Sequence, residues 1–317
     1  MRLRRICLIG GTGFVGRHLA ARLIREGYRI TMLTRRREAH RDLLVLPGLQ
    51  LLECRLFDAP DLSAKLQGMD AVVNLVGILN EQRRGDFQRI HVELPRRIIE
   101  ACRSNGIKRL LHMSALRADA EHGPSQYLRS KGEGESLVQA ADDLQATVFR
   151  PSVIFGPEDD FLNRFARLLA SSPGVFPLAC AKAQFAPVYV GDVAEAFTRA
   201  LQLRDTIGQA YELCGPKPYT LHQLVDYVAQ ITGHRRRIIP LGDRLSWWLG
   251  LLMEHLPGKP FSRDNYLSTR VTSLCKSPFP EIFGITPSAI EAVAPAYLGQ
   301  RNTNARFNRW RRWARRD

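Results

Sequence analysis

The chain has 317 residues, 45% of them hydrophobic and 24% charged, a composition that excludes a disordered or fibrous protein. No apolar run approaches the roughly 20 residues that span a bilayer. The run near the N-terminus is too short for the core of a signal peptide, so we expect a cytoplasmic protein. The excess of 46 Lys and Arg over 31 Asp and Glu gives a net charge of +15, which indicates an anionic partner such as a nucleotide, an acidic membrane or nucleic acid.

The first 150 residues alternate between short apolar runs and amphipathic stretches. This pattern predicts strands at 5–9, 28–33, 49–54, 70–79, 107–114 and 145–156, and helices at 14–26, 87–106 and 126–141. Strands that alternate with helices are typical of a doubly wound parallel sheet. We therefore predict an α/β protein in which residues 1–150 form a Rossmann-type, dinucleotide-binding domain.

The regular alternation of strands and helices ends after Pro151. Prolines and loops become more frequent there, and helices are predicted at 193–203 and 221–232. We expect residues 151–317 to form a smaller C-terminal α/β lobe for substrate or partner binding, with segments at about 185–205 returning to the first domain. A small-molecule substrate would then bind in the cleft between the two lobes, because lobe junctions and strand ends form crevices.

A glycine-rich turn joins the first predicted strand to the first predicted helix. A strand must reverse into a helix there, which Gly10 permits; Gly13 lets backbone approach a diphosphate, and Gly16 lets the helix pack closely on the sheet. Free N–H groups at the helix N-terminus favour the negative charge. The predicted cofactor-binding turn comprises Gly10, Gly11, Thr12, Gly13, Phe14, Val15 and Gly16.

The end of the second strand indicates which dinucleotide is preferred. An acidic residue there would bind the ribose hydroxyls of NAD, but this chain has Thr34 followed by Arg35 and Arg36. A guanidinium can bind a phosphate with paired charged hydrogen bonds. We therefore expect NADP(H), with NAD(H) as the alternative, and interpret the next arginines, Arg37 and Arg41, as a solvated basic loop.

Further cofactor contacts follow from the topology of such a sheet. Asp58 after the third strand is a candidate for the adenine edge, and Val76 and Gly77 after the fourth would line the middle of the cofactor. Lys131 and Pro151 complete the predicted set.

Tyr127 and Lys131 are four residues apart and share one face of a predicted helix. A free tyrosine has a pKa of about 10, and a nearby ammonium group lowers that pKa and makes proton exchange easier. Lys131 could also hold the nicotinamide ribose. Ser114, at the end of the fifth strand, is a candidate to hydrogen-bond a substrate carbonyl or alcohol. The alternative is an exposed Tyr/Lys pair without a catalytic role.

Together, the segments "GGTGFVG", "MSA", "YLRSK", "RPSVIFGPEDDFLNRF" and "PVYVGDVAEA" resemble the extended and atypical short-chain dehydrogenase/reductase superfamily. Within it, the chain is similar to the branch of the nucleotide-binding accessory subunit of respiratory complex I and its bacterial relatives. The resemblance implies Tyr127 and Lys131 at the family's catalytic positions. It covers residues 1 to about 230. The run Ser114, Ala115, Leu116 departs from the active pattern, in which two serines precede a further Ser or Thr.

Two functions remain open at this stage. The first is hydride transfer between NADP(H) and a carbonyl or alcohol, with quinones among the candidate substrates. The second, which the branch resemblance implies, is a non-catalytic NADPH-binding structural or assembly factor of a membrane respiratory complex. In either case the protein could be peripheral to the inner membrane.

Two aromatic and basic stretches indicate a further partner. Residues 245–253 include Trp247 and Trp248 and predict either a helix on a membrane surface or one packed on the small lobe. The basic tail 301–317 carries seven arginines, with Phe307, Trp310 and Trp313 at helical spacing. The tail could bind anionic lipid, a membrane protein complex or RNA. The alternative is a solvated tail that has no partner. Nucleic acid is not expected, since no nucleic-acid module is visible.

We expect no metal site. The six cysteines are scattered without a CxxC pair, which favours reduced thiols. Asp159 and Asp160 are interpreted as helix caps. Four histidines without a second ligand at metal spacing are interpreted as structural: His18, His91, His112 and His222.

Overall fold

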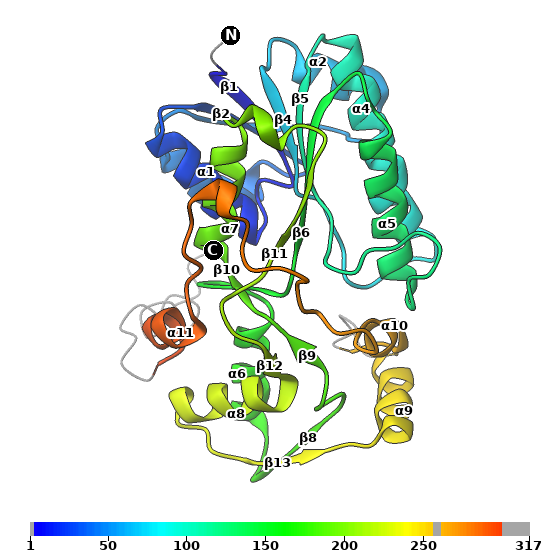
Figure 1. Ribbon diagram of the computed structural model, residues 1–317, viewed down its shortest axis with the longest axis vertical. Helices are drawn as coiled ribbons and strands as arrows, with labels where there is room; N and C mark the ends of the chain where they lie inside the picture. Colours follow the sequence, from blue (N-terminus) through cyan, green and yellow to red (C-terminus); the bar gives the residue numbers. More distant parts are fainter. Residues whose placement is uncertain (1–2, 256–260, 300–317) are drawn as a thin grey trace. The chain divides into compact units, whose positions relative to one another are not determined.

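The structure is a computed structural model that describes residues 3–255 and 261–299. The chain forms two compact units (Figure 1). Unit 1 comprises the described residues of Met1–Pro151, Val190–Leu213 and Cys275–Ile285, and unit 2 those of Ser152–Tyr189, Cys214–Leu274 and Thr286–Asp317. The returning segment expected at about 185–205 corresponds to Val190–Leu213, and a second segment, Cys275–Ile285, also joins unit 1.

Unit 1 is built on a sheet of seven parallel strands in the order β11-β6-β5-β4-β1-β2-β3. The strands are β1 Arg5–Ile9, β2 Arg29–Thr34, β3 Leu49–Glu53, β4 Ala71–Asn74, β5 Arg109–Met113, β6 Gln145–Pro151 and β11 Ala210–Leu213. Every residue of β4 and β5 is buried, as expected for strands covered on both faces of a parallel sheet. This is the predicted doubly wound α/β fold.

Helices cover both faces of this sheet, with α2, α4 and α5 side by side on one face and α1 with α7 on the other (Figure 1). The helical segments of unit 1 are α1 Phe14–Arg25, η1 Glu38–Val45, α2 Ala59–Leu66, α3 Asp86–Gln88, η2 Arg89–Glu93, α4 Leu94–Ser104, α5 Gln126–Gln139, α7 Val190–Ala200, η3 Arg204–Thr206 and η4 Glu281–Phe283.

The run at 145–156, a predicted strand that continues into a loop, forms β6 up to Pro151 and then a separate short strand, Ile154–Phe155. Two further predicted elements differ from those observed. The strand predicted at 70–79 ends at Asn74, where the side-chain Oδ1 accepts the amide of Val76 at 3.1 Å and the chain leaves the sheet. The helix predicted at 87–106 contains one π-helical segment, Arg89–Glu93, between α3 and α4. Both differences lie beside the candidate site described below.

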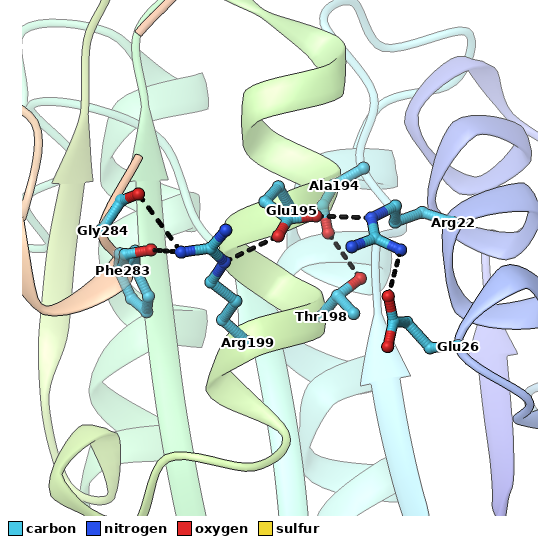
Figure 2. Close-up of polar contacts among 8 residues, drawn as sticks. All are labelled: Arg22, Glu26, Ala194, Glu195, Thr198, Arg199, Phe283 and Gly284. Atoms are coloured by element: carbon cyan, nitrogen blue, oxygen red, sulfur yellow. Dashed lines mark hydrogen bonds and ion pairs between the residues drawn. The ribbon is translucent and has the colours of Figure 1, made fainter. Parts of the chain in front are cut away.

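A charged network attaches both returning segments to the first helix of unit 1 (Figure 2). Arg22 of α1 donates to Glu195 of α7 at 2.5 Å, and Arg199, one turn further along α7, donates to the other oxygen of Glu195 at 2.6 Å. Arg199 also donates to the carbonyl of Phe283 in η4. These bonds hold α1, α7 and the segment Cys275–Ile285 together.

Unit 2 has its own hydrophobic core, formed largely by α6, α8 and α11. Three pairs of short strands surround it, β7 with β10, β9 with β12, and β8 with β13. Its elements are β7 Ile154–Phe155, α6 Leu162–Ser171, β8 Val175–Leu178, β9 Gln184–Phe185, β10 Val188–Tyr189, β12 Tyr219–Thr220, α8 Leu221–Thr232, β13 Arg237–Pro240, α9 Asp243–Met253, α10 Arg263–Ser268 and α11 Ile290–Leu298. Within the described ranges, no helix is both long and apolar enough to cross a bilayer.

The two predicted helix caps have different outcomes. Asp159 Oδ1 accepts the amide of Leu162 at 2.6 Å, at the first residue of α6, whereas Asp160 is ion-paired with Arg164.

Four cysteines are free thiols: Cys7, Cys54, Cys102 and Cys180. The expectation that all six are reduced is wrong for Cys214 and Cys275, which are disulfide-bonded. Spacing along a sequence does not reveal which cysteines meet in space.

Candidate active site

The glycine turn connects β1 to α1 at the carboxyl edge of the sheet. Gly10 has a φ of +81°, which glycine adopts without steric cost, and a Cβ built there would lie 3.0 Å from the backbone nitrogen of Val76. The predicted residues Gly10 and Val76 are therefore adjacent in space. Gly13 is the N-cap of α1, so no side chain caps the first amides of this helix, and these amides remain available to an anion.

Close packing explains the other glycines of the turn. A Cβ built on Gly16 would lie only 2.4 Å from the Cα of Gly11, and one built on Gly11 would lie 2.8 Å from Met32 Cγ. Gly13 differs from both, because the nearest atom to a Cβ built there is the carbonyl oxygen of Gly10, at 3.3 Å. Gly16 thus allows α1 to pack closely on the turn, while Gly13 stands at the N-cap of α1, where a side chain would meet one backbone oxygen.

The arginines after β2 lie on the surface beside this turn. Thr34 is buried, and its Oγ1 accepts the amide of Arg36 at 3.3 Å, which bends the chain out of the strand. Arg35 and Arg36 are exposed. Their guanidinium groups have no hydrogen-bond or ion-pair partner among the residues that the structure describes, whereas Arg41 is paired with Glu38. Arg35 and Arg36 are therefore available to an added anion.

Asp58 is engaged within its own loop. Its Oδ1 accepts the amide of Asp61 at 3.1 Å as the N-cap of α2, and its Oδ2 lies 3.0 Å from the guanidinium of Arg55. Asp58 is predicted for the adenine edge, whereas α2 and its cap are not among the elements predicted from the sequence. The adenine role of Asp58 stays a prediction.

The loop after β4 and the helix α5 meet at Lys131. A Cβ built on Gly77 would lie 3.6 Å from Lys131 Nζ, so two predicted cofactor residues that are 54 positions apart in the sequence come together. Lys131 is 4% exposed, and its ammonium donates to the carbonyl oxygen of Met113, at the end of β5, at 2.7 Å. Burial lowers the pKa of Lys131 to about 8, against the opposing effect of Glu135.

Tyr127 lies one turn before Lys131 on α5, in an aromatic setting. Its ring is edge-to-face with the rings of His91 and Phe87, at centroid distances of 5.6 and 6.1 Å. Phe87 and Ser130 also line a pocket of about 290 Å³ in unit 1, whose wall includes Arg129. Tyr127 itself is not among the residues that line this pocket; its neighbours Phe87 and Ser130 are.

His91, interpreted from the sequence as structural, contacts both the loop after β4 and the helix α5. Its Nε2 accepts the amide of Ile78 at 3.1 Å, and its Nδ1 lies 2.8 Å from Ser130 Oγ. Ser130 in turn donates to the carbonyl of Tyr127 at 2.9 Å. Burial and the charge of Lys131 lower the pKa of His91 to about 2, which agrees with a neutral ring that accepts at Nε2. No periodicity pointed to this residue, because its partners are distant in sequence.

Ser114 and Pro151 border the site on the sheet. Ser114 is 4% exposed, and its Oγ is buried without a hydrogen-bond partner among the described residues. Buried hydroxyls are normally paired, so this oxygen is an unsatisfied group beside β5. The carbonyl of Pro151, at the end of β6, accepts the amide of Leu116 at 3.0 Å. Leu116, two residues after Ser114, is buried.

These observations fit a bound dinucleotide. Three features belong to unit 1: the uncapped N-terminus of α1, the two arginines without a partner among the described residues, and Gly77, which lacks a side chain beside Lys131. They supply donors and positive charge for phosphate and ribose groups. In the part of the chain that the structure describes, no cluster of His, Cys, Asp or Glu is arranged to hold a metal ion.

Comparison with known proteins agrees with this architecture. A family model described as "NAD dependent epimerase/dehydratase family" matches residues 6–214. The chain is 32% identical over 306 residues to "NADH dehydrogenase (ubiquinone) 1 alpha subcomplex subunit 9, mitochondrial" of Mus musculus, which covers 93% of this chain and 80% of that protein. It is 30% identical over 249 residues to "Ceramide reductase" of Caulobacter vibrioides, which covers 75% of this chain and 74% of that protein.

A solved structure shares the fold. A double mutant of DesIV, a dTDP-glucose 4,6-dehydratase from Streptomyces venezuelae with NAD and DAU bound, superimposes with a TM-score of 0.65 over 76% of this chain and 84% of that chain, at 20% identity. The chain therefore belongs to the NAD dependent epimerase/dehydratase family, within the extended short-chain dehydrogenase/reductase superfamily, and has complex I subunits among its relatives.

Proposed function

We propose that this protein binds NADP(H) and catalyses hydride transfer to or from a carbonyl or alcohol. The observation that carries the proposal is the position of Lys131. This residue is buried, lies one turn from Tyr127 on α5, and has its ammonium group next to Gly77, which has no side chain. A bound nicotinamide would supply or accept the hydride. The remaining chemistry, proton transfer and substrate orientation, then falls to the chain's own residues.

Tyr127 is proposed to exchange the proton with the substrate oxygen. The ammonium of Lys131 favours the phenolate form of a neighbouring tyrosine, and general acid–base catalysis is most effective when the pKa lies near the working pH. Because burial lowers the pKa of Lys131 to about 8, its charge falls off above that pH. Activity that depends on this charge should therefore decline at alkaline pH.

NADP(H) rather than NAD(H) is proposed because Arg35 and Arg36 are unpaired among the described residues and no acid ends β2. Thermal unfolding of the purified protein with each cofactor tests this preference. A ligand at 100 times its dissociation constant stabilises the folded state by about 2.7 kcal/mol. NADPH should raise the melting temperature more than NADH does, and the double variant Arg35→Gln/Arg36→Gln should abolish the difference. Equal shifts in the unaltered protein would contradict the preference.

Turnover is tested by oxidation of NADPH with carbonyl compounds, including quinones and long-chain ketones, since one relative is a ceramide reductase. Tyr127→Phe should lower kcat by at least about a hundredfold, the usual size of a general acid–base contribution, while NADPH binding persists. Equal rates in the two proteins would remove Tyr127 from the reaction.

A second function, a non-catalytic NADPH-binding component of a membrane respiratory complex, has specific support. Leu116, part of the run that departs from the active pattern, is buried, the Ser114 hydroxyl is inaccessible to solvent, and complex I subunits are among the relatives. This function places the protein in the cytoplasm, peripheral to the inner membrane. It predicts NADPH-dependent stabilisation without turnover on any carbonyl, and co-purification with a membrane complex.

A further inference from the structure

Helix α9 of unit 2, Asp243–Met253, has two small residues buried and several of its large apolar residues exposed to solvent. Ser246 and Gly250 are buried, and a Cβ built on Gly250 would lie 3.1 Å from the backbone nitrogen of Arg263, where α10 begins. Leu245, Trp248 and Leu252 are 60%, 61% and 69% exposed. Burying apolar surface is favourable, so a helix that turns this face outward lacks a partner in the described chain.

The exposed residues form one continuous stripe. Their spacing of three and four residues places them on a single face of α9. Trp247, 36% exposed, stands edge-to-face against Trp248 at a centroid distance of 5.3 Å. In Figure 1, α9 follows β13 in the chain and is continued by α10. We call Leu245, Trp247, Trp248 and Leu252 the α9 surface.

Basic residues precede α9 in the chain, and a further one, Arg244, lies on α9 itself next to Leu245, whereas Arg235 lines a pocket with Asp226 and Gln230 of α8. Residues 234–252 contain four arginines and one aspartate. Three of these arginines, Arg235, Arg237 and Arg244, are exposed, and their guanidinium groups have no ion-pair partner among the described residues. Tryptophan and leucine beside unpaired arginine is the composition of helices that lie in the interface of anionic membranes.

We propose that the α9 surface docks unit 2 onto an anionic lipid bilayer, with the apolar stripe among the acyl chains and the arginines at the phosphate groups. A lipid surface is favoured over a protein partner because α9 combines indole rings with the exposed Arg244, which has no ion-pair partner among the described residues. Such aromatic rings prefer the boundary between an apolar and a wet phase. The docking does not depend on the proposed enzyme activity.

The four tryptophans of the chain allow a direct test. Two are on α9 and two, Trp310 and Trp313, are in the basic tail, so the variant Trp310→Phe/Trp313→Phe reports on α9 alone. Its fluorescence is measured with vesicles of phosphatidylcholine alone and with 30 mol% phosphatidylglycerol added, a fraction of about a third that gives a strongly anionic surface. We expect a blue shift, and quenching by brominated acyl chains, only with the anionic vesicles. Unchanged emission with both vesicles would overturn the proposal.

A matched pair of variants locates the docking surface. In Leu245→Ser/Leu252→Ser the two side chains are already in solvent, so folding should persist, and affinity for anionic vesicles should fall at least about tenfold. The control Leu44→Ser/Val45→Ser removes exposed apolar residues from unit 1 and should bind as the unaltered protein does. Arg244→Gln should weaken binding about fivefold at low salt.

Two results would refute lipid docking. Equal vesicle affinity in the α9 variant and the unaltered protein would show that another surface binds. A concentration-dependent dimer in sedimentation that the α9 variant loses, without vesicle binding by either protein, would assign the surface to a second copy of the chain.

Discussion

At the scale of single residues, Gly13 and Gly16 are needed for different reasons, which two alanine substitutions separate. Gly16→Ala would place a methyl group 2.4 Å from the Cα of Gly11, and overpacking of this kind costs about 1–3 kcal/mol. Gly13→Ala meets only one oxygen, at 3.3 Å, with φ at −75°, so it should fold normally. Instead it should lose NADPH affinity, because its methyl group would stand at the N-cap of α1, beside the amides that no side chain caps.

Urea unfolding and NADPH titration check both substitutions. Gly16→Ala should lower the free energy of unfolding, and Gly13→Ala should raise the Kd by about tenfold or more with the unfolding midpoint unchanged, the effect of about 1.4 kcal/mol of lost binding. An alanine at position 13 that leaves NADPH binding intact would mean that the diphosphate binds elsewhere.

His91 should make the protein sensitive to acid. Its pKa is about 2 in the folded protein but about 6.5 in an unfolded chain, so between these values unfolding takes up a proton. Stability therefore falls as pH decreases below about 6.5, by about 1.4 kcal/mol per pH unit for this group. His91→Asn should show a correspondingly smaller loss between pH 6.5 and 5.5 in urea unfolding.

Ser130→Ala provides the comparison for His91. It removes the hydroxyl bonded to Nδ1 and should lower stability by about 1 kcal/mol, yet the steep dependence on pH should remain because the ring still titrates. A pH slope that is the same in His91→Asn and the unaltered protein would show that His91 does not titrate on unfolding.

Residues predicted for the site lie close together where chain topology determines their position, and their roles stay predictions. Gly10 with Val76, and Gly77 with Lys131, are close because carboxyl ends of neighbouring parallel strands meet at one edge. His91 could not be assigned in this way, since its contacts to Ile78 and Ser130 depend on how the π-helical segment packs against α5. Four isolated histidines look alike in a sequence.

At the scale of elements, Glu195 joins α1 and α7 (Figure 2). Its side chain is 19% exposed, and loss of hydrogen bonds to charged groups costs about 1.5–3 kcal/mol. Glu195→Ala should therefore lower the free energy of unfolding by about 2 kcal/mol at pH 7. Glu26→Ala removes a more exposed partner of Arg22 and should cost less than about 0.5 kcal/mol.

The Glu195 network also has a defined pH window. Hydrogen bonds from Arg22 and Arg199 hold the pKa of Glu195 below its ordinary value. The contribution to stability is complete above the unfolded glutamate pKa of about 4.3 and disappears as pH falls through the lower folded-state value. Unfolding curves of Glu195→Ala and the unaltered protein should therefore converge under strongly acidic conditions, and a constant gap down to that range would argue against an ion pair.

Element types were predictable from local patterns, but their orientations were not. The apolar runs of β1 and β5 and the amphipathic period of α8 correspond closely to the predicted ranges. The sequence of α9 left two alternatives, membrane surface or packing on the small lobe, because tryptophans suit both. Only the packing of Ser246 and Gly250 shows that several of the large residues face outward.

At the scale of the whole molecule, the basic tail 301–317 lies outside the described residues and remains a sequence-based proposal for binding an anionic surface or a membrane complex. It carries seven arginines and one aspartate, or +6 of the net +15. Deleting it should reduce binding to anionic vesicles and the dependence of that binding on salt, while NADPH stabilises the shortened chain as before. Unchanged pelleting with vesicles would remove the tail from membrane binding and leave α9.

By itself the sequence determined the parallel sheet, the glycine turn, the Tyr127–Lys131 pair and the basic loop at Arg35 and Arg36. These features depend on periodicity, on backbone freedom and on charge, which are local properties of a chain. Only the tertiary structure decided that Lys131 is buried against Gly77, that His91 joins two sides of the site, and that α9 exposes its aromatic face. Burial and long-range contact depend on how elements pack, and residues that never come close along the chain carry no mutual signal in a single sequence.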